Sequence, residues 1–81
     1  MENRIIFENE DVIIERSDSD DYLATITNKT DKLIDFGIPE FGLDANWGMD
    51  PYPDGCIYIK ADETGYEMLD ALEAGNFDYV I

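Results

Sequence analysis

The chain has no histidine, a single cysteine and only five basic residues among its 81 positions. Histidine is the usual general base and metal ligand, so its absence argues against most acid–base catalysis and against zinc, haem and copper sites. Cys56 cannot form an intramolecular disulfide, and we expect it to be a small buried hydrophobe within an apolar strand. We therefore predict that the protein is not an enzyme and holds no cofactor or metal.

Long apolar segments are also missing. No stretch approaches the roughly 20 apolar residues that a membrane-spanning helix requires. The first ten residues lack the basic start, the apolar run and the small-residue cleavage site of a secretory signal, so we expect a cytoplasmic location. The scarcity of Lys and Arg argues against direct binding to nucleic acid or to an anionic membrane, because both depend on those side chains.

Acidic residues are abundant instead. Twenty Asp and Glu residues give a net charge of −15, and the second half of the chain, residues 40–81, contains Lys60 as its only base. The hydrophobic content of 44% is nevertheless enough for a core, so we expect one folded acidic domain over residues 1–81. A domain this small buries only about 60% of its unfolded surface, which leaves self-association open.

Short apolar or alternating runs between polar turns predict strands. The first four, at residues 4–7, 12–16, 22–28 and 32–36, are expected to form an antiparallel meander, with further strands at 56–60 and 77–81. Residues 5–7 and 12–14 are apolar on both faces, so these two strands should lie mid-sheet or be covered on both sides. Residues 37–55 hold all three prolines and predict a long loop, with a short strand near 41–43.

A single helix is expected between Thr64 and Gly75. Thr64 and Glu67 match a capping box that starts a helix, and Gly75 suits the left-handed position that ends one. The apolar positions between them share one face, which should pack on the sheet: Met68, Leu69 and Leu72, with Tyr66 at its edge. The predicted fold class is therefore α+β, a small and mostly antiparallel sheet of about five or six strands with one packed α-helix.

The other side of this helix is acidic. It carries Glu63, Glu67, Asp70 and Glu73, and no Lys or Arg follows Asp62 to form i,i+4 ion pairs. Asp70 and Glu73 also stand toward the C-terminal end, where the helix dipole disfavours negative charge. Solubility alone requires a net charge of only about 2 to 8 in magnitude, so we infer that a cationic partner offsets the repulsion.

The commonest concentrated positive surface is a groove that binds nucleic acid. Glu67, Asp70 and Glu73 recur about every 4.5 Å along a helix, close to the 3.4 Å phosphate spacing of one DNA strand. We therefore predict a DNA-mimic inhibitor, of the kind phages use against CRISPR or restriction nucleases, that blocks access to a basic nucleic-acid-binding protein such as a nuclease. A second acidic row could come from two turns: Glu8, Glu10 and Asp11, or Asp18, Asp20 and Asp21.

The loop at 37–55 adds candidate contacts for the same partner. Trp47 lies there with three candidate partner-binding acids, Asp44, Asp50 and Asp54. Trp47 is either an exposed anchor, since tryptophan often dominates binding energy, or a lid folded over the small core. We favour the lid, because an 81-residue domain needs that apolar area.

Two other functions fit the same composition. An immunity protein for a cationic toxin nuclease would use the same electrostatics, and a non-inhibitory domain could owe its acidity to stabilisation by salt or calcium. Oxygen ligands for calcium could come from either of two sets, Asp18, Asp20 and Asp21 or Asp44, Asn46 and Asp50, but neither follows the EF-hand pattern. A homodimer through the strand edge at 77–81 is a further prediction.

Overall fold

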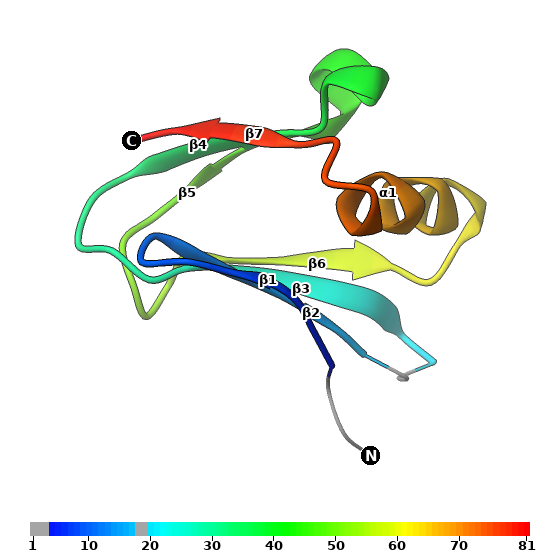
Figure 1. Cartoon of the computed structure of the whole chain (residues 1–81), viewed down its shortest axis with the longest axis horizontal. Helices are drawn as coiled ribbons and strands as arrows, with labels where there is room; N and C mark the ends of the chain where they lie inside the picture. Colours follow the sequence, from blue (N-terminus) through cyan, green and yellow to red (C-terminus); the bar gives the residue numbers. More distant parts are fainter. Residues whose placement is uncertain (1–3, 18–19) are drawn as a thin grey trace.

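The computed structural model describes residues 4–17 and 20–81. In chain order its elements are β1 (Arg4–Glu8), β2 (Val12–Arg16), β3 (Tyr22–Asn28), β4 (Ile34–Gly37), the 3₁₀ helix η1 (Pro39–Ala45), β5 (Asn46–Met49), β6 (Cys56–Lys60), α1 (Glu63–Glu73) and β7 (Asp78–Val80). The strands pair antiparallel in two sheets, and α1 packs with them, so the predicted α+β class is confirmed (Figure 1).

Sheet A has the strand order β1-β2-β3-β6, and sheet B has the order β5-β4-β7. Sheet A forms one layer, and α1 and sheet B together cover its inner face (Figure 1). The chain crosses from sheet A to sheet B between β3 and β4 and returns between β5 and β6. The apolar inner faces of both sheets therefore meet in one core.

The predicted meander stops after three strands. β3 pairs with β6, not with β4, and Ile26 lies opposite Ile57. Asn28 at the end of β3 is fully buried, and its amide donates hydrogen bonds to the carbonyl oxygens of Lys32 (2.7 Å) and Met49 (3.1 Å). These contacts hold the chain where it leaves sheet A, because a buried amide is costly unless it is hydrogen-bonded.

The expectation that β1 and β2 both lie mid-sheet, or are covered twice, is wrong for β1. β1 is an edge strand, and Ile5 is 53% exposed, whereas β2 does lie between two neighbours. The register between β1 and β2 shifts between Ile5 and Phe7, as at a β-bulge. Ile6 and Phe7 consequently both pack against the core, which explains the unbroken apolar run without a second covering layer.

The short strand of the 37–55 segment lies later than predicted. Residues 41–43 belong to η1, which begins at Pro39 and contains Gly42 at a φ of 57°. The strand is β5, in which Trp47 pairs with Phe36 and Met49 pairs with Ile34 of β4. Trp47 and Met49 alternate with exposed positions, so β5 satisfies the period of two better than 41–43 does.

The helix begins at Glu63, and the predicted cap at Thr64 is wrong. Asp62 is the N-cap, since its carboxylate accepts a hydrogen bond from the backbone N–H of Gly65 at 2.7 Å. Gly65 is buried, and a Cβ there would stand 1.8 Å from the carbonyl oxygen of Lys60. The close approach of β6 to the first helical turn therefore sets the start of α1.

The predicted end of the helix is confirmed. Gly75 has a φ of 80°, and its N–H donates to the carbonyl oxygen of Leu72 at 3.1 Å. The N–H of Asn76 donates to the carbonyl oxygen of Ala71 at 2.9 Å. The two bonds form a Schellman motif, which redirects the chain from α1 into β7.

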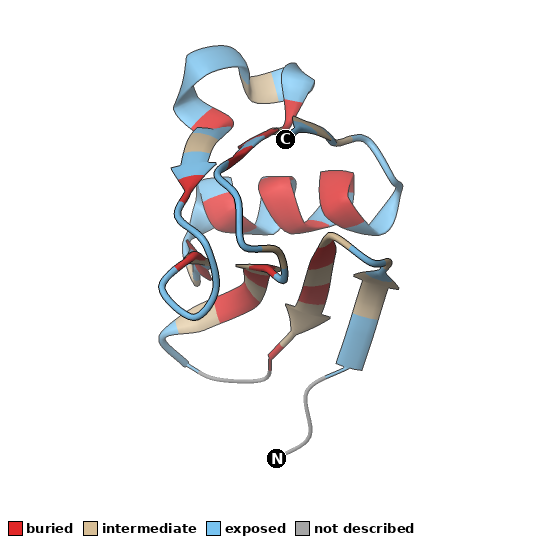
Figure 2. Cartoon of the chain, turned by 90° about the vertical axis from the view of Figure 1, so that its left-hand side faces the viewer, coloured by how far each residue is buried: buried red, intermediate tan, exposed pale blue. Residues whose placement is uncertain are grey.

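The core joins the two sheets through aromatic rings. Phe36, at the centre of sheet B, stacks with Trp47 and Tyr79 at centroid distances of 6.4 Å each. Phe77 links this row to sheet A, since its ring lies 5.3 Å from Phe36 and 5.1 Å from Phe7. Trp47 is partly buried in this row, a placement that agrees with its interpretation as a lid. Figure 2 shows that buried residues recur along α1 and the strands around the interior.

The expectation that Cys56 is a buried hydrophobe is wrong. Cys56 is only half-buried, because it lies on the outer face of sheet A, where Thr27 donates a hydrogen bond to its Sγ at 3.8 Å.

None of the helices in residues 4–17 and 20–81 has the length and apolar character that crossing a bilayer requires.

Candidate protein-binding surface

The exposed side of α1 carries the predicted acidic residues. Met68, Leu69 and Leu72 are buried against the sheets, which turns Glu63, Glu67 and Asp70 toward solvent. These three stand at i, i+4 and i+7 and share one face of the helix. Tyr66, three residues after Glu63 and four before Asp70, is 57% exposed among them. We call these four residues, Glu63, Tyr66, Glu67 and Asp70, the acidic helix face.

Tyr66 is a residue that the sequence pattern did not single out for binding. We expected it at the edge of the apolar stripe, and the structure exposes it instead. Its spacing from Glu63 and Asp70 was a signal in the sequence, since residues three and four apart are neighbours on a helix. An exposed tyrosine surrounded by carboxylates combines apolar area with a hydroxyl group that can form hydrogen bonds.

Glu73 differs from the other helix acids because it is compensated. Arg4 and Arg16 reach it from sheet A, each with an N–O distance of 3.5 Å. The prediction of an uncompensated helix is therefore wrong at this position, where tertiary contacts supply the bases that the helix itself lacks. These pairs are partly exposed and so contribute little to stability, but they neutralise Glu73 toward a partner.

The acidic helix face has no such compensation. In the part of the chain that the structure describes, Glu63, Glu67 and Asp70 form no ion pair. Neighbouring carboxylates about 6 Å apart on a helix repel each other by about 0.7 kcal/mol in water before salt screens them. Approach of positive charge from outside would relieve that repulsion.

The loop acids do not join this face as one patch. Asp44 lies on η1, which contacts α1. Asp50 and Asp54 belong to the turn between β5 and β6, which Figure 1 shows on the opposite side of the molecule from α1. All three are exposed. A single flat partner facing α1 would therefore reach Asp44 more readily than the other two.

The first of the two alternative acidic rows is engaged within the molecule. Glu8 pairs with Lys29 at 3.0 Å, and Asp11 accepts a hydrogen bond from the Tyr79 hydroxyl at 2.8 Å. Burial, and then the hydrogen bond to Asp11, raise the pKa of Tyr79. Of the second row, Asp20 is exposed, and Asp18 lies outside the described residues. Among the described residues, the helix is therefore the row with the most exposed carboxylates on one face.

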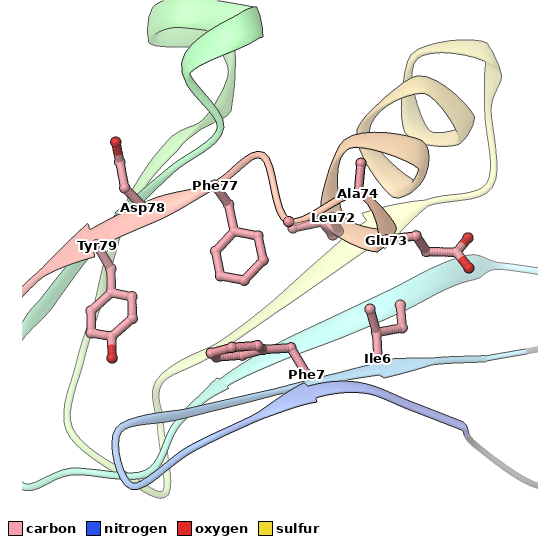
Figure 3. A pocket seen from close by; sticks show the side chains of 9 residues that line it. Ile6, Phe7, Leu72, Glu73, Ala74, Phe77, Asp78 and Tyr79 are labelled. Atoms are coloured by element: carbon pink, nitrogen blue, oxygen red, sulfur yellow. The ribbon is translucent and has the colours of Figure 1, made fainter.

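A groove of about 600 Å³ separates the edges of the two sheets beside the end of α1 (Figure 3). Ile6 and Phe7 of β1 lie on one side, and Phe77 and Tyr79 lie on the other. Figure 3 shows Phe77 and Tyr79 pointing toward β1, while Asp78 points away from the groove. The groove is thus mainly apolar and stands apart from the uncompensated carboxylates of α1.

Metal ligands are not gathered in the described parts of the chain. Residues 4–17 and 20–81 contain no group of three or more acidic or cysteine side chains placed to hold a metal ion. Asp44 and Asp50, from one of the calcium sets considered above, flank opposite ends of β5. The other set includes Asp18, which is outside the described residues.

No protein-family model, curated protein or solved structure matches the chain. Function is therefore inferred from the charge, exposure and contacts of this chain's own residues.

Proposed function

We propose that the protein is an acidic inhibitor that binds the nucleic-acid-binding surface of a basic target enzyme, such as a nuclease, and blocks access of nucleic acid. The supporting observation is the acidic helix face, where three exposed carboxylates surround Tyr66 without an ion pair among the described residues. In this proposal the carboxylates take the place of phosphates, as in DNA mimics directed against CRISPR or restriction nucleases.

The spacing of the carboxylates supports this mode of action. Glu63, Glu67 and Asp70 follow one another by four and three residues, which corresponds to axial steps of about 6 and 4.5 Å. Phosphates of one DNA strand recur about every 3.4 Å along the duplex axis. Side chains of Lys and Arg are long and flexible enough to accommodate this difference, so a basic groove could engage all three acids.

Charge and aromatic contact would contribute to binding in different ways, charge to the association rate and the aromatic contact to the binding energy. The net charge of −15 steers a basic partner toward the protein and raises the association rate. Tyr66, which is exposed in the free protein, would become buried at the interface and supply the aromatic contact that commonly carries much of the binding energy. Because salt screens charges within about 10 Å at 0.1 M, affinity should fall steeply as salt rises.

Affinity capture from a host lysate at low and moderate salt tests the proposal. We expect the immobilised protein to retain a basic nucleic-acid-binding protein, and added duplex DNA to displace it. The triple variant Glu63→Gln, Glu67→Gln, Asp70→Asn should lose that protein. A matched control, Asp31→Asn, Asp35→Asn, Asp78→Asn, removes the same charge from exposed positions elsewhere and should retain it.

Two results would contradict the proposal. Retention of no basic nucleic-acid-binding protein at low salt would remove the inhibitory function. Equal loss of binding in the helix variant and in the control would show that net charge alone attracts the partner. We also propose a cytoplasmic location, where enzymes acting on intracellular nucleic acid would be met.

A further inference from the structure

The outer face of sheet A presents apolar and hydroxyl-bearing side chains to solvent. Its inner face is covered by α1 and sheet B, and no described element lies over the outer one (Figure 1). Outward positions include Ile5, Ile13, Tyr22, Thr25, Thr27 and Tyr58. Ile5 and Tyr58 are 53% and 59% exposed, and the rings of Tyr22 and Tyr58 are 5.1 Å apart. This surface is thus apolar and hydroxyl-rich.

The same face is close to neutral. Glu8 there is paired with Lys29, at 3.0 Å. Among the described residues of its strands, Glu15 is the other outward carboxylate, and it lies in the cross-strand row that runs through Thr25 to Tyr58. Lys60, two residues beyond Tyr58 on β6, supplies the opposing charge. On a molecule of net charge −15, this neutrality distinguishes the outer face of sheet A from α1.

We propose that the outer face of sheet A binds a second copy of the chain, as a two-fold dimer packed sheet on sheet. Two copies that each carry −15 repel each other least where the contact is neutral. A two-fold axis running along β3 would place β2 of one copy over β6 of the other. Glu15 would then face Tyr58 and approach Lys60 of the second copy, and symmetry would repeat the contact.

The contact is small, so the dimer is weak. Four strands about 4.8 Å apart, with five residues rising about 3.3 Å each, span a face of about 320 Å². Stable complexes usually bury about 800 Å² on each partner. Since salt screens the repulsion between two acidic copies, dimerisation should strengthen as salt rises. That dependence is opposite in sign to the one expected for a basic target.

Sedimentation equilibrium of the full chain tests this proposal at about 0.1 M and about 1 M salt, where the Debye lengths are about 10 Å and 3 Å. We expect the dimerisation constant to rise several-fold at the higher salt. Thr25→Arg at the centre of the face should lower it at least tenfold, although the added positive charge reduces the net charge of −15 by one. Thr64→Arg on α1 makes the same charge change away from the face and should not weaken the dimer.

A charge exchange tests the arrangement of the two copies. Glu15→Lys and Lys60→Glu should each weaken the dimer, and the double variant should restore it, because each altered residue again meets its opposite. Circular dichroism and thermal unfolding would show that the variants remain folded.

Three outcomes would overturn the proposal. The chain could stay monomeric at both salt concentrations, or dimerise equally well with Thr25→Arg, which would favour another surface such as the strand edge at 77–81. Loss of target binding in Thr25→Arg, without any dimer in the wild type, would assign the face to the target instead.

Discussion

The acidic helix face and the outer face of sheet A differ in net charge and in whether their carboxylates have basic residues nearby. On α1 the exposed carboxylates have no counter-ion among the described residues, and a single tyrosine lies between them. Among the described residues on the outer face of sheet A, two acids are balanced by two bases, and the other outward side chains are Ile, Thr, Tyr and Cys56. The net charge of the whole chain therefore does not describe each surface, because the uncompensated acids are concentrated on particular faces.

Salt separates the two faces experimentally. Attraction of a cationic partner to α1 weakens as salt rises, whereas contact between two copies through sheet A strengthens.

Gly65→Ala should destabilise the fold by separating the start of α1 from sheet A. The added Cβ would stand 1.8 Å from the carbonyl oxygen of Lys60, so the turn between β6 and α1 must open. We expect a loss of about 3 kcal/mol or more in the free energy of unfolding. Urea denaturation measures it, and Gly48→Ala, where a Cβ meets nothing within 4 Å, is the control, with a change of about 0.5 kcal/mol or less. Equal losses in both variants would contradict this account of Gly65.

Asn28→Ala should lower stability without altering either face. The substitution removes the side-chain donor from the backbone carbonyl oxygens of Met49 and Asp50, and the backbone N–H of Thr30 loses the Asn28 oxygen that accepts its hydrogen bond. Buried polar groups left without partners predict a loss of about 2 kcal/mol. Urea denaturation measures the stability, and target capture by the folded variant should be unchanged. A change below about 0.5 kcal/mol would show that Asn28 does not hold the crossing between the sheets.

Single charge changes on α1 should distinguish the uncompensated acids of the helix from the compensated Glu73. Asp70→Asn should weaken binding of a basic target at low salt by about threefold to tenfold, or about 0.7 to 1.4 kcal/mol. Glu73→Gln should have a smaller effect, because Arg4 and Arg16 already neutralise Glu73. Conversely, Arg16→Gln should strengthen binding slightly by releasing that carboxylate. Titration calorimetry with the captured target measures all three, and an effect of Glu73→Gln equal to that of Asp70→Asn would contradict the distinction.

The smallest effect concerns alkaline pH and Tyr79. Burial, and then the hydrogen bond to Asp11, raise its pKa above the ordinary value of about 10, so the folded state favours the neutral phenol. The resulting stability is present below pH 10 and is lost as pH rises through the folded pKa. Tyr79→Phe should therefore unfold with less pH dependence than the wild type between about pH 9 and pH 11.5.

The wild type is the necessary comparison in this experiment because Tyr58 titrates in the same sense. The neighbouring Cys56 raises the pKa of Tyr58, and both groups remain in the Tyr79→Phe variant. Identical pH dependence of urea denaturation in the two proteins would contradict the role given to Tyr79.

The elements that the sequence predicts well are those with local causes. β2, β3 and β6 have the predicted bounds, because alternation and flanking polar turns act over a few residues. The end of α1 at Gly75 is likewise local, since a left-handed position favours glycine. The start of α1 was missed because Asp62 and Thr64 are both suitable caps, and the approach of β6 to Gly65 decides between them.

In the candidate site, too, the features with local causes are predictable and those set by distant contacts are not. Exposure of Glu63, Glu67 and Asp70 was predictable, because the apolar stripe of α1 directs them outward. Compensation of Glu73 was not, since Arg4 and Arg16 lie more than 50 residues away in sequence. Nor could spacing alone show that the turn between β5 and β6, which contains Asp50 and Asp54, lies on the other side of the molecule from α1 (Figure 1).

The excess of carboxylates, the α+β class and the two-sided character of the helix follow from composition and periodicity, which are properties of neighbouring residues. The packing of distant segments places β4 in the second sheet, makes β1 an edge strand and brings two arginines to Glu73. The physical reason is that strand partners and ion pairs join distant segments, and many pairings satisfy the same local pattern until one core buries them together.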